Sequence, residues 1–567
     1  MSSWNKHPEL GLFLVLKMLV VSRDGVNRLC DKLSGGELEF LTGYQKFITA
    51  YFKSDKFKDK LMLLLYMEVG TGKTLTSLVC GVEGLNSKRF KRVVVLSPKS
   101  VQDEFQKNLE MYYRLANVEK NEQEKINDKI IMIPYNANNS SVQVKWLGDM
   151  EKSLFIIDEA HLFMKSIIKV NLLPNVNERN VGNAKKIYDM IKGLKDKKVI
   201  LLTGTPSTKH PFETVPMFNL AGCDLPITYE LFNERYVDKV RNEIIRKDEL
   251  RKKLSGLVAH VSNKDEKQKL KASELIVEDV EMSVEQYKQY LVDYKLELKE
   301  RGFSNKRNVY GLMFGAKSSF HAKTFEDSVY WNHQLKEGDK DRYVGEIVVD
   351  MKHCPKVIKM YEDSKEVHGS CVFYFRFVKM YGVDTMEQCL KNEGYELASS
   401  NSEKVFEKKA KRYVLFTGSV NYGTRVRWKD MFNDKRNRYG EYIKYLLLSP
   451  SGAVGLTLKN VRYLGIGSCE FQYSTIRQIM GRVNRLGSHM DLPEQDRTLI
   501  NKLYLSSKNM SWYKKNRDEL NEVCSREAPD WDEVAPTIER CIYQDSLIDD
   551  MINESYRSVL RDVSIIK

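Results

Sequence analysis

One short loop of the sequence carries glycine, lysine and threonine in the order needed to bind a triphosphate. In the string GTGKT, the glycines let the backbone turn tightly so that its N–H groups face an anion. The lysine can reach the β and γ phosphates, and the threonine hydroxyl can bind Mg²⁺. Met67 stands where the GxxxxGK[ST] pattern has its first glycine, and the competing interpretation is an ordinary strand–turn–helix with a surface lysine. The predicted nucleotide contacts are Gly70, Thr71, Gly72, Lys73 and Thr74.

Two carboxylates follow an apolar run further along the chain, in FIIDEAH. A short buried strand before Asp158 and Glu159 would place them at its C-terminal end, where ligands bind in open α/β sheets. Asp158 is the predicted Mg²⁺ ligand, and Glu159 is the group predicted to polarise an attacking water. Acids at the start of a helix are the common alternative. The position after GTGKT, behind a strand, favours catalysis.

A third apolar run ends in small hydroxyl residues, in LLTGTPSTKHPFE. Thr203 and Thr205 flank a glycine there, which by itself is a weak turn signal. After GTGKT and DEAH the signal is stronger, because hydroxyls at the end of a neighbouring strand could relay the state of the nucleotide between domains.

A cationic stripe occupies the string QIMGRVNRLGSH. Gly481, Arg482 and Arg485 follow Gln478 by three, four and seven positions, so a helix would place all four on one face. That spacing normally marks a buried apolar stripe, whereas this stripe is polar. The spacing alone does not say what would need two guanidiniums on one helical face.

The apolar runs indicate which elements position these residues. Bounded runs alternate with segments of helical period, which predicts parallel sheets covered on both faces. The predicted strands are 61–67, 92–98, 129–135, 153–158 and 198–204, with a second set at 369–377, 412–418, 445–450 and 461–467. The predicted fold class is α/β with two parallel-sheet domains.

The boundaries between domains follow shifts in composition. Residues 1–225 are predicted to hold an N-terminal segment and the first sheet domain, and residues 351–510 the second. The stretch 226–350 is charge-dense with helical period, which predicts a mainly helical insertion or linker, and 511–567 is predicted to be a helical tail.

The composition narrows the class of protein. The 567 residues carry a net charge of +14, which favours a polyanionic partner without separating nucleic acid from an acidic protein. The nine cysteines form no CxxC pair, so neither a zinc site nor a disulfide framework is predicted, and a reducing compartment is favoured. The early run LGLFLVLKMLVV is too short to cross a bilayer, and we expect no membrane segment.

The motifs, taken in order, resemble those of a known superfamily. GTGKT, DEAH, TGTP and QIMGRVNR are similar to motifs I, II, III and VI of superfamily 2 helicase-like ATPases. The resemblance implies two RecA-like domains with ATP bound in the cleft between them, and Arg482 and Arg485 reaching the γ-phosphate with Gln478 beside them. It also implies that Gln45, in TGYQKF, reads adenine.

Two further strings extend the resemblance to nucleic-acid contacts. LSPKSVQDEF resembles motif Ia, which contacts a nucleic-acid backbone in the superfamily, and SPSGAVGLTLKNVRYL resembles motif V. Gly455 of motif V is assigned to nucleotide binding. The positions assigned to nucleic acid are Ser97, Lys99, Ser100, Thr203 and Thr457.

A narrower likeness covers residues from about 40 to 510. HCPKVIKMYED, RYVLFTG and above all GRVNRLGSHMDLPEQDR resemble the poxvirus-type nucleoside triphosphatase I and the related small subunit of the viral early transcription factor. Those are Swi/Snf-like DNA-dependent ATPases of large cytoplasmic DNA viruses and yeast cytoplasmic linear plasmids. One departure is Phe375, which stands where that family has a small hydroxyl residue.

The leading hypothesis is a Mg²⁺-dependent ATPase that translocates on DNA and acts in transcription of a cytoplasmic virus-like or plasmid genome. RNA as the track, and the cognate RNA polymerase or capping enzyme as a partner, are left open. Basic segments at 407–412 and 425–438 could line the track, with Trp428 available to stack, or form a solvated surface. The alternatives are a strand-separating helicase in replication and a non-catalytic scaffold. Activity with and without DNA would discriminate the scaffold, and an unwinding assay the helicase.

Overall fold

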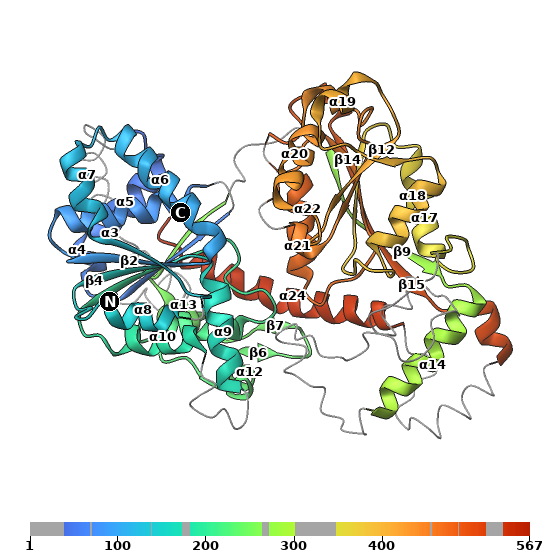
Figure 1. The fold of residues 1–567 in the computed structure, drawn as a ribbon. Helices are drawn as coiled ribbons and strands as arrows, with labels where there is room; N and C mark the ends of the chain where they lie inside the picture. Colours follow the sequence, from blue (N-terminus) through green and yellow to red (C-terminus); the bar gives the residue numbers. More distant parts are fainter. Residues whose placement is uncertain are drawn as a thin grey trace, which may run out of the picture. The chain divides into compact units, whose positions relative to one another are not determined.

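The computed structural model describes residues 39–68, 71–137, 139–172, 182–262, 271–300, 347–453, 456–485, 487–516 and 537–566. The chain forms two compact units, each built on one parallel β-sheet (Figure 1). Unit 1 is drawn from residues 1–265 and 550–567, and unit 2 from residues 266–549. The sequence therefore predicts the α/β class and the two sheets correctly.

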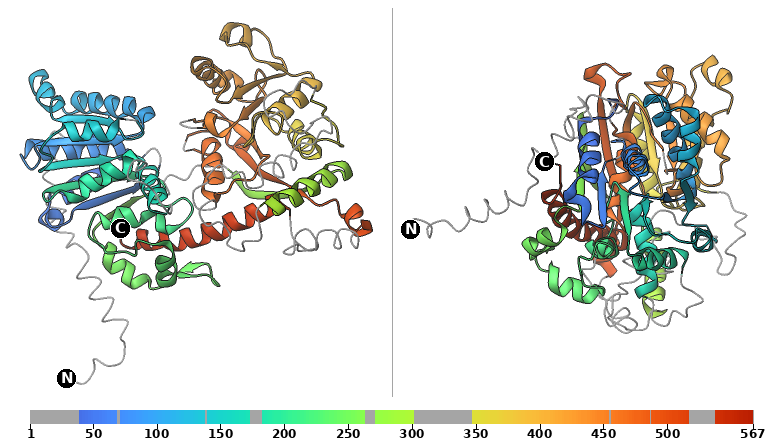
Figure 2. Two further views of the ribbon diagram at one scale, coloured as in Figure 1. Left: turned by 60° about the horizontal axis from the view of Figure 1, so that its bottom comes forward. Right: turned by 90° about the vertical axis from the view of Figure 1, so that its left-hand side faces the viewer.

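The sheet of unit 1 has six strands in the order β3-β2-β4-β5-β1-β8, all parallel. Apolar side chains fill both faces of its central strands, as expected for a sheet covered on both sides. Figures 1 and 2 show helices on each side of it. The strands are β1 (Met62–Met67), β2 (Arg92–Ser97), β3 (Ile130–Pro134), β4 (Ser153–Ile157), β5 (Lys197–Thr203) and β8 (Val258–Val261).

The helices of unit 1 follow their strands closely, which keeps every strand pointing the same way. They are α3 (Gly43–Lys53), α4 (Asp55–Lys58), α5 (Lys73–Asn86), α6 (Gln102–Leu115), α7 (Lys120–Asn127), α8 (Ser140–Trp146), α9 (Ala160–Leu172), α10 (Asn183–Gly193), α11 (Val215–Asn219), α12 (Tyr229–Tyr236) and α13 (Lys247–Leu254). A small hairpin, β6 (Val237–Asp238) with β7 (Glu243–Ile244), lies between the last two.

The sheet of unit 2 has seven parallel strands in the order β11-β12-β13-β10-β14-β15-β9. They are β9 (Lys271–Glu281), β10 (Ser370–Tyr374), β11 (Glu396–Leu397), β12 (Arg412–Phe416), β13 (Tyr445–Leu448), β14 (Val461–Ile466) and β15 (Thr498–Ser507). The helices around it are α14 (Val284–Glu300), α17 (Pro355–Lys365), α18 (Val383–Asn392), α19 (Ser402–Glu407), α20 (Tyr422–Phe432), α21 (Pro450–Ala453) and α22 (Tyr473–Val483).

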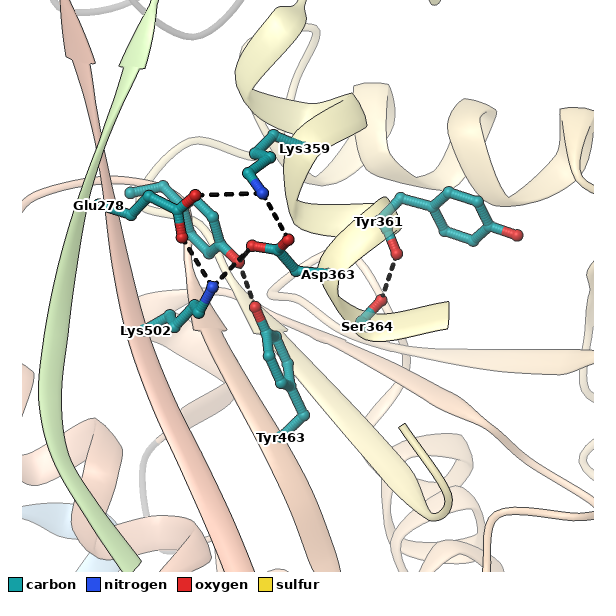
Figure 3. Close-up of polar contacts among 8 residues, drawn as sticks. Glu278, Lys359, Tyr361, Asp363, Ser364, Tyr463 and Lys502 are labelled. Carbon is teal, nitrogen blue, oxygen red and sulfur yellow. Dashed lines mark hydrogen bonds and ion pairs between the residues drawn. The ribbon is translucent and has the colours of Figure 1, made fainter. Parts of the chain in front are cut away.

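A polar network fixes β9 at the edge of the second sheet (Figure 3). Lys502 on β15 donates to Glu278 of β9 at 2.7 Å and to Asp363 of α17 at 2.9 Å. Lys359 reaches the same two carboxylates, at 3.2 Å and 2.7 Å. Tyr504 donates to Asp363 at 2.6 Å. Two ammonium groups shared between two carboxylates hold the strand more firmly than one exposed ion pair does.

The last helix, α24 (Ile538–Asp562), contributes residues to both units. Its first turns belong to unit 2, where Glu539 forms a fully buried ion pair with Lys356 of α17 at 2.6 Å. Its last turns belong to unit 1, where Tyr556 is buried and its hydroxyl lies 2.7 Å from Thr214 Oγ1. Within the described ranges, no helix is both long and apolar enough to cross a membrane.

All nine strands predicted from apolar runs are present, but the polar-flanked strands β8, β9, β11 and β15 were not predicted. The stretch from 226 holds the helices α12, α13 and α14, as its period indicates. It also holds β8, an edge strand of the unit 1 sheet, and β9, an edge strand of the unit 2 sheet. β9 was missed because four acidic residues interrupt its apolar alternation. Residues 10–21, 301–346 and 517–536 lie outside the described residues.

Candidate functional site

The loop between β1 and α5 has the geometry of a phosphate cradle. Gly72 adopts φ +76°, in the left-handed region, and α5 begins at the next residue, Lys73. The helix N-terminus leaves backbone N–H groups free to face an anion. Val69 and Gly70 lie outside the described residues. The strand and helix that both interpretations of GTGKT require are therefore present, and Gly72 lies where the backbone needs a left-handed residue.

Helix α3 holds this loop in place. Tyr44 donates its hydroxyl to the Thr71 carbonyl at 2.9 Å, and Gln45 Nε2 donates to the Gly72 carbonyl at 3.4 Å. Gln45 Oε1 accepts the Thr42 N–H at 2.9 Å. A Cβ at Gly72 would lie 2.6 Å from Gln45 Nε2, so a larger residue there would displace the end of the Gln45 side chain. Gln45 thus braces the loop, and its contact with adenine stays a prediction.

Lys73 lies within the loop. Its Nζ donates to the Met67 carbonyl at 3.0 Å and approaches that of Glu68 at 3.5 Å. Burial lowers the pKa of Lys73, and the nearby carboxylates of Glu159 and Asp158 act in the opposite direction. A bound phosphate would offer this ammonium a charged acceptor in place of neutral carbonyls, a stronger hydrogen bond.

The two acids of FIIDEAH lie at the C-terminal end of β4, as predicted. Asp158 is buried, and its Oδ1 accepts the Glu159 N–H at 2.8 Å. Burial raises the pKa of Asp158, while that hydrogen bond and Lys73 lower it. Glu159 has φ +46°, a left-handed conformation that costs a non-glycine residue about 1–3 kcal/mol. Such strain typically persists where a side chain must be aimed.

His161 joins these acids to the third motif. Its Nδ1 lies 3.3 Å from Glu159 Oε2 and 3.0 Å from Thr203 Oγ1. Burial lowers the pKa of His161 to about 4, so the ring is neutral at neutral pH. Thr203 Oγ1 also accepts the Thr205 N–H at 3.0 Å. One imidazole therefore contacts the side chains at the ends of two neighbouring strands.

The chemistry of the donors fits a divalent cation. Asp158 offers a buried carboxylate. The cation that lowers its pKa is the Lys73 ammonium. Thr74 lies in the first turn of α5 and is half-buried. Carboxylate and hydroxyl oxygens, supplemented by water and phosphate, are the ligands Mg²⁺ prefers. These are the two residues that the sequence assigns to the metal.

The cationic string of unit 2 forms α22 only in part. Gln478 is exposed, and nothing lies within 4 Å of a Cβ built on Gly481, so this face of the helix is open. The helix ends at Val483 because Asn484 leaves the helical region, with φ −115° and ψ 71°. The prediction of one continuous helical face is therefore wrong for Arg485, which lies beyond the helix.

Arg485 is nevertheless fixed within unit 2. Its Nη1 donates to Thr457 Oγ1 and its Nε to the Gly481 carbonyl, the latter at 3.2 Å. Burial lowers the pKa of Arg485. Residues 487–490 form a turn, in which His489 Nε2 lies 2.7 Å from the Val461 carbonyl on β14. The GSH string thus secures the arginine segment to the sheet.

The residues that the sequence assigns to nucleic acid differ in how accessible their side chains are. Ser97 is buried with no hydrogen-bond partner for its hydroxyl, whereas Lys99 is exposed. Thr203 is wholly buried, whereas Thr457 is half-buried and its hydroxyl accepts a hydrogen bond from Arg485. Ser100 belongs to a short 3₁₀ turn, Lys99–Val101. Gly455 lies outside the described residues.

The expectation that Trp428 is available to stack on a base is wrong. The indole is buried in the core of unit 2, and its Nε1 donates to the Ala398 and Ser399 carbonyls at 3.0 Å and 3.2 Å. In the same basic segments Arg412 is buried against backbone carbonyls and Arg436 pairs with Asp434 at 2.8 Å. Phe375 is also buried, which excludes it as a surface contact.

Two residues of the site were missed by the sequence reasoning. Tyr44 precedes the predicted adenine-reading glutamine, and only the fold reveals its bond to the P-loop. His161 is the last residue of the DEAH string, and the sequence alone assigns it no function. A polar residue three positions after Asp158, on the first turn of a helix, was the available signal.

Comparison with known proteins places these observations in a wider group. A family model for the type III restriction enzyme, res subunit, matches residues 37–208. The chain is 28% identical to the termination factor NPH-I homolog of African swine fever virus, over 92% of this chain and 79% of that protein. It is 24% identical to the putative ATP-dependent RNA helicase R350 of Acanthamoeba polyphaga mimivirus, over 81% of this chain and 67% of that protein. A Sulfolobus solfataricus SWI2/SNF2 ATPase core in complex with dsDNA aligns with 17% identity and a TM-score of 0.33, over 92% of this chain and 96% of that chain.

Proposed function

We propose that this chain, which resembles superfamily 2 helicase-like nucleoside triphosphatases of the NPH-I type, hydrolyses ATP and uses the energy to move along DNA. The observation that carries the proposal is the group of side chains at one edge of the unit 1 sheet. Lys73 follows β1, Asp158 and Glu159 follow β4, and Thr203 ends β5. His161 connects the last two strands by contacts of 3.0 and 3.3 Å.

Each side chain has a distinct task in this proposal. Lys73 and the backbone N–H groups at the start of α5 bind the β and γ phosphates, and Gln45 reads adenine. Thr74 and Asp158 hold Mg²⁺, which when bound neutralises charge on the phosphates. Glu159 accepts a hydrogen bond from the attacking water and orients it, and His161 fixes the direction of the Glu159 carboxylate.

Unit 2 supplies the guanidiniums in this proposal. Arg485, with Arg482 and Gln478 beside it, stabilises the negative charge that builds up on the transferring phosphoryl group. An arginine supplied in this way is worth about 10³–10⁵ in rate in GTPases. To reach the phosphate, Arg485 must first break its hydrogen bond to Thr457. In this proposal the Thr457 hydroxyl holds the guanidinium when no nucleotide is bound.

In this proposal Lys73 of unit 1 and Arg485 of unit 2 both act on the nucleotide, so hydrolysis would be coupled to a closing motion that moves a strand of DNA. The net charge of +14 suits a DNA track. The name of one relative, a viral termination factor homolog, favours a role in transcription. We extend the proposal to initiation or termination on a cytoplasmic virus-like or plasmid genome, as the motif resemblance implies. Cytoplasmic localisation belongs to the same proposal.

The decisive experiment measures phosphate release from ATP with no nucleic acid and with single-stranded DNA, duplex DNA or RNA. Stimulation by DNA supports the proposal. Stimulation by RNA alone would redirect it to an RNA track, and no hydrolysis with any of them would contradict it. Lys73→Ala, expected to lose nucleotide binding, is the control for a contaminating ATPase.

A further inference from the structure

The hairpin of β6 and β7 stands out from unit 1 beside α12 (Figure 1). Its antiparallel strands pair Val237 with Ile244 and Asp238 with Glu243, leaving a four-residue tip, residues 239–242. A two-stranded ribbon this short is rarely stable by itself. Its persistence therefore depends on how the base is anchored.

The base of the hairpin is held firmly. Ile244 is buried, and its N–H donates to Ser555 Oγ of α24 at 3.0 Å. The Ile245 N–H donates to the Tyr236 carbonyl at 2.8 Å. Tyr236 is itself fully buried, and its hydroxyl donates to Glu249 Oε1 at 2.7 Å. The ribbon is thus fixed to α12, α13 and α24 within unit 1.

The tip is shaped in advance by its own side chains. Asp238 Oδ1 accepts the N–H groups of Val240 and Arg241, at 2.9 Å and 3.0 Å. These two hydrogen bonds lower the pKa of Asp238, so the carboxylate stays ionised at neutral pH. Asn242 closes the turn with φ +54°, a conformation that asparagine tolerates. A preformed tip loses little entropy when it binds a partner.

The chemistry of the tip is unusual for a solvent-facing loop. Val240 is 91% exposed, the most exposed of the large apolar residues in the described part of the chain. Lys239 and Arg241 flank it, both exposed, and Arg241 approaches its nearest acid, Asp238, only at 3.9 Å. A single exposed valine needs no explanation. A valine between two cations on a rigid projecting ribbon fits a partner that is apolar at one point and anionic on both sides.

Duplex DNA meets that description. Its phosphates border a groove whose walls are sugars and whose floor carries thymine methyl groups, and a two-stranded β-ribbon fits the major groove. Unpaired bases would instead call for aromatic side chains to stack on. The tip has none.

The hairpin is also attached to the segment that follows the third motif. The rings of Tyr229 and Phe232 in α12 contact His210, with centroids 4.9 Å and 5.9 Å apart. His210 lies five residues after Thr205, in the loop after β5. A shift of the Thr203 strand end, which contacts His161, would therefore reach the hairpin through packed side chains.

We propose that the tip Lys239–Val240–Arg241 enters a groove of duplex DNA, with the two cations on phosphates and the valine against the groove wall. The inference rests on the proposed function, since it names a contact on the same DNA track. It adds a surface that none of the helicase-like motifs contains.

The test measures binding of the full chain to a blunt-ended DNA duplex as a function of salt. The double variant Lys239→Ala/Arg241→Ala should make the negative slope of log K against log salt shallower by about 1.8, or about 0.9 for each lost phosphate contact. Each lost contact should also weaken binding about eightfold at 0.1 M salt. The matched control is Lys120→Ala/Lys125→Ala on α7, which removes two exposed lysines from the same unit. It should change neither quantity.

A second variant tests the valine without altering the cations. Val240→Asp places a carboxylate against the groove and should abolish DNA stimulation of ATP hydrolysis, while hydrolysis without DNA stays at the wild-type rate. Unchanged stimulation and an unchanged salt slope in the tip variants would overturn the inference and leave the proposed function standing. A wild-type chain that neither binds nor responds to DNA overturns both. A tip defect confined to RNA overturns the duplex assignment.

Discussion

The imidazole of His161 lies 3.0 Å from the hydroxyl of Thr203, across the ends of two neighbouring parallel strands. His161 also contacts Glu159 at 3.3 Å, so the group proposed to orient water and the end of β5 share one neutral ring. A movement of the Glu159 carboxylate would therefore shift His161 and, through it, Thr203, where the loop that leads to α12 begins. This is a physical route for the relay that the hydroxyl residues of TGTP led us to expect.

If that contact transmits the state of the nucleotide, breaking it at either end should have the same effect. We expect His161→Ala and Thr203→Val each to reduce DNA stimulation of ATP hydrolysis, with the KM for ATP nearly unchanged because neither residue binds the phosphates. The double variant should lose no more than either single variant, since side chains in contact are not additive. Additive losses in kcat would show that the two residues act separately.

Replacing Glu159 by Gln should separate binding from turnover. The amide cannot accept a proton from water, so kcat is expected to fall by about 10²–10⁴-fold. Nucleotide affinity should stay close to that of the wild type, because Lys73 and the loop amides are untouched. Isothermal titration with ATP and a phosphate-release assay measure the two quantities. Normal turnover by the variant would remove Glu159 from its role.

Burial of the neutral His161 ring makes stability depend on pH. The pKa of His161 is about 4 in the folded chain and about 6.5 when unfolded. Below pH 6.5 the unfolded chain takes up a proton that the folded chain refuses, so this residue lowers stability progressively from about pH 6.5 to about 4, by about 3 kcal/mol in total. Above pH 6.5 it contributes nothing to the pH dependence.

Urea unfolding at a series of pH values measures this effect. His161→Gln keeps a polar side chain that does not titrate, so its stability should fall less steeply than that of the wild type over the same range. Asp158 works in the opposite direction, because burial raises its pKa and the folded chain binds its proton first. Its contribution is common to both chains and cancels in the comparison. Equal slopes would contradict the assignment of a neutral ring.

The pairing of Arg485 with Thr457 predicts opposite results for two variants. Arg485→Ala should lower kcat by about 10³-fold or more without a comparable loss of ATP affinity, as expected for a group that acts on the transition state. Thr457→Val releases the guanidinium from its partner and should leave kcat unchanged or raised. Arg477→Ala, on the exposed side of α22, is the matched control. If Arg482→Ala abolishes turnover and Arg485→Ala does not, Arg482 rather than Arg485 is the residue that stabilises the transferring phosphoryl group.

The buried pair of Lys356 and Glu539 should dominate the stability of unit 2. Lys356→Met leaves the Glu539 carboxylate buried without its cation, and breaking such a pair typically costs about 3–5 kcal/mol. The double variant Lys356→Met/Glu539→Leu removes both charges and should recover most of that loss. Calorimetric unfolding of the two variants distinguishes the cases. A single variant as stable as the double would show that water reaches the carboxylate.

The sequence predicts the central strands well, and with them the places of Lys73 and Asp158 after β1 and β4, because both depend on local pattern. The runs VVVL and FII are buried on both faces in this fold, and Asp158 follows directly from the C-terminal end of the second. Long-range pairing has no such signature. The acidic residues of β9 make it resemble a surface segment in the sequence, and only the fold shows that Lys359 and Lys502 pair with Glu278.

The burial and contacts of individual cationic and aromatic side chains could not be predicted from the sequence either. Trp428 lies among basic residues, yet the indole packs into the core because two backbone carbonyls accept its N–H. Arg485 falls at helical spacing after Gln478, but one asparagine ends the helix before it. Spacing predicts a face only while the helix continues, and the point where it ends is decided by a few tenths of a kcal/mol per residue.

Helix α24 has a consequence for the order in which the molecule can be made. Tyr556, Val559 and Leu560 are buried in unit 1, and the Ile565 N–H donates to the Val258 carbonyl at 2.8 Å on the edge strand β8. During synthesis on the ribosome these residues emerge after the whole of unit 2. The first sheet must therefore wait, with an apolar face uncovered, for a segment translated almost three hundred residues later than its last strand. Unit 2 waits in the same way for the first turns of α24, because Ile542 and Tyr543 complete its core.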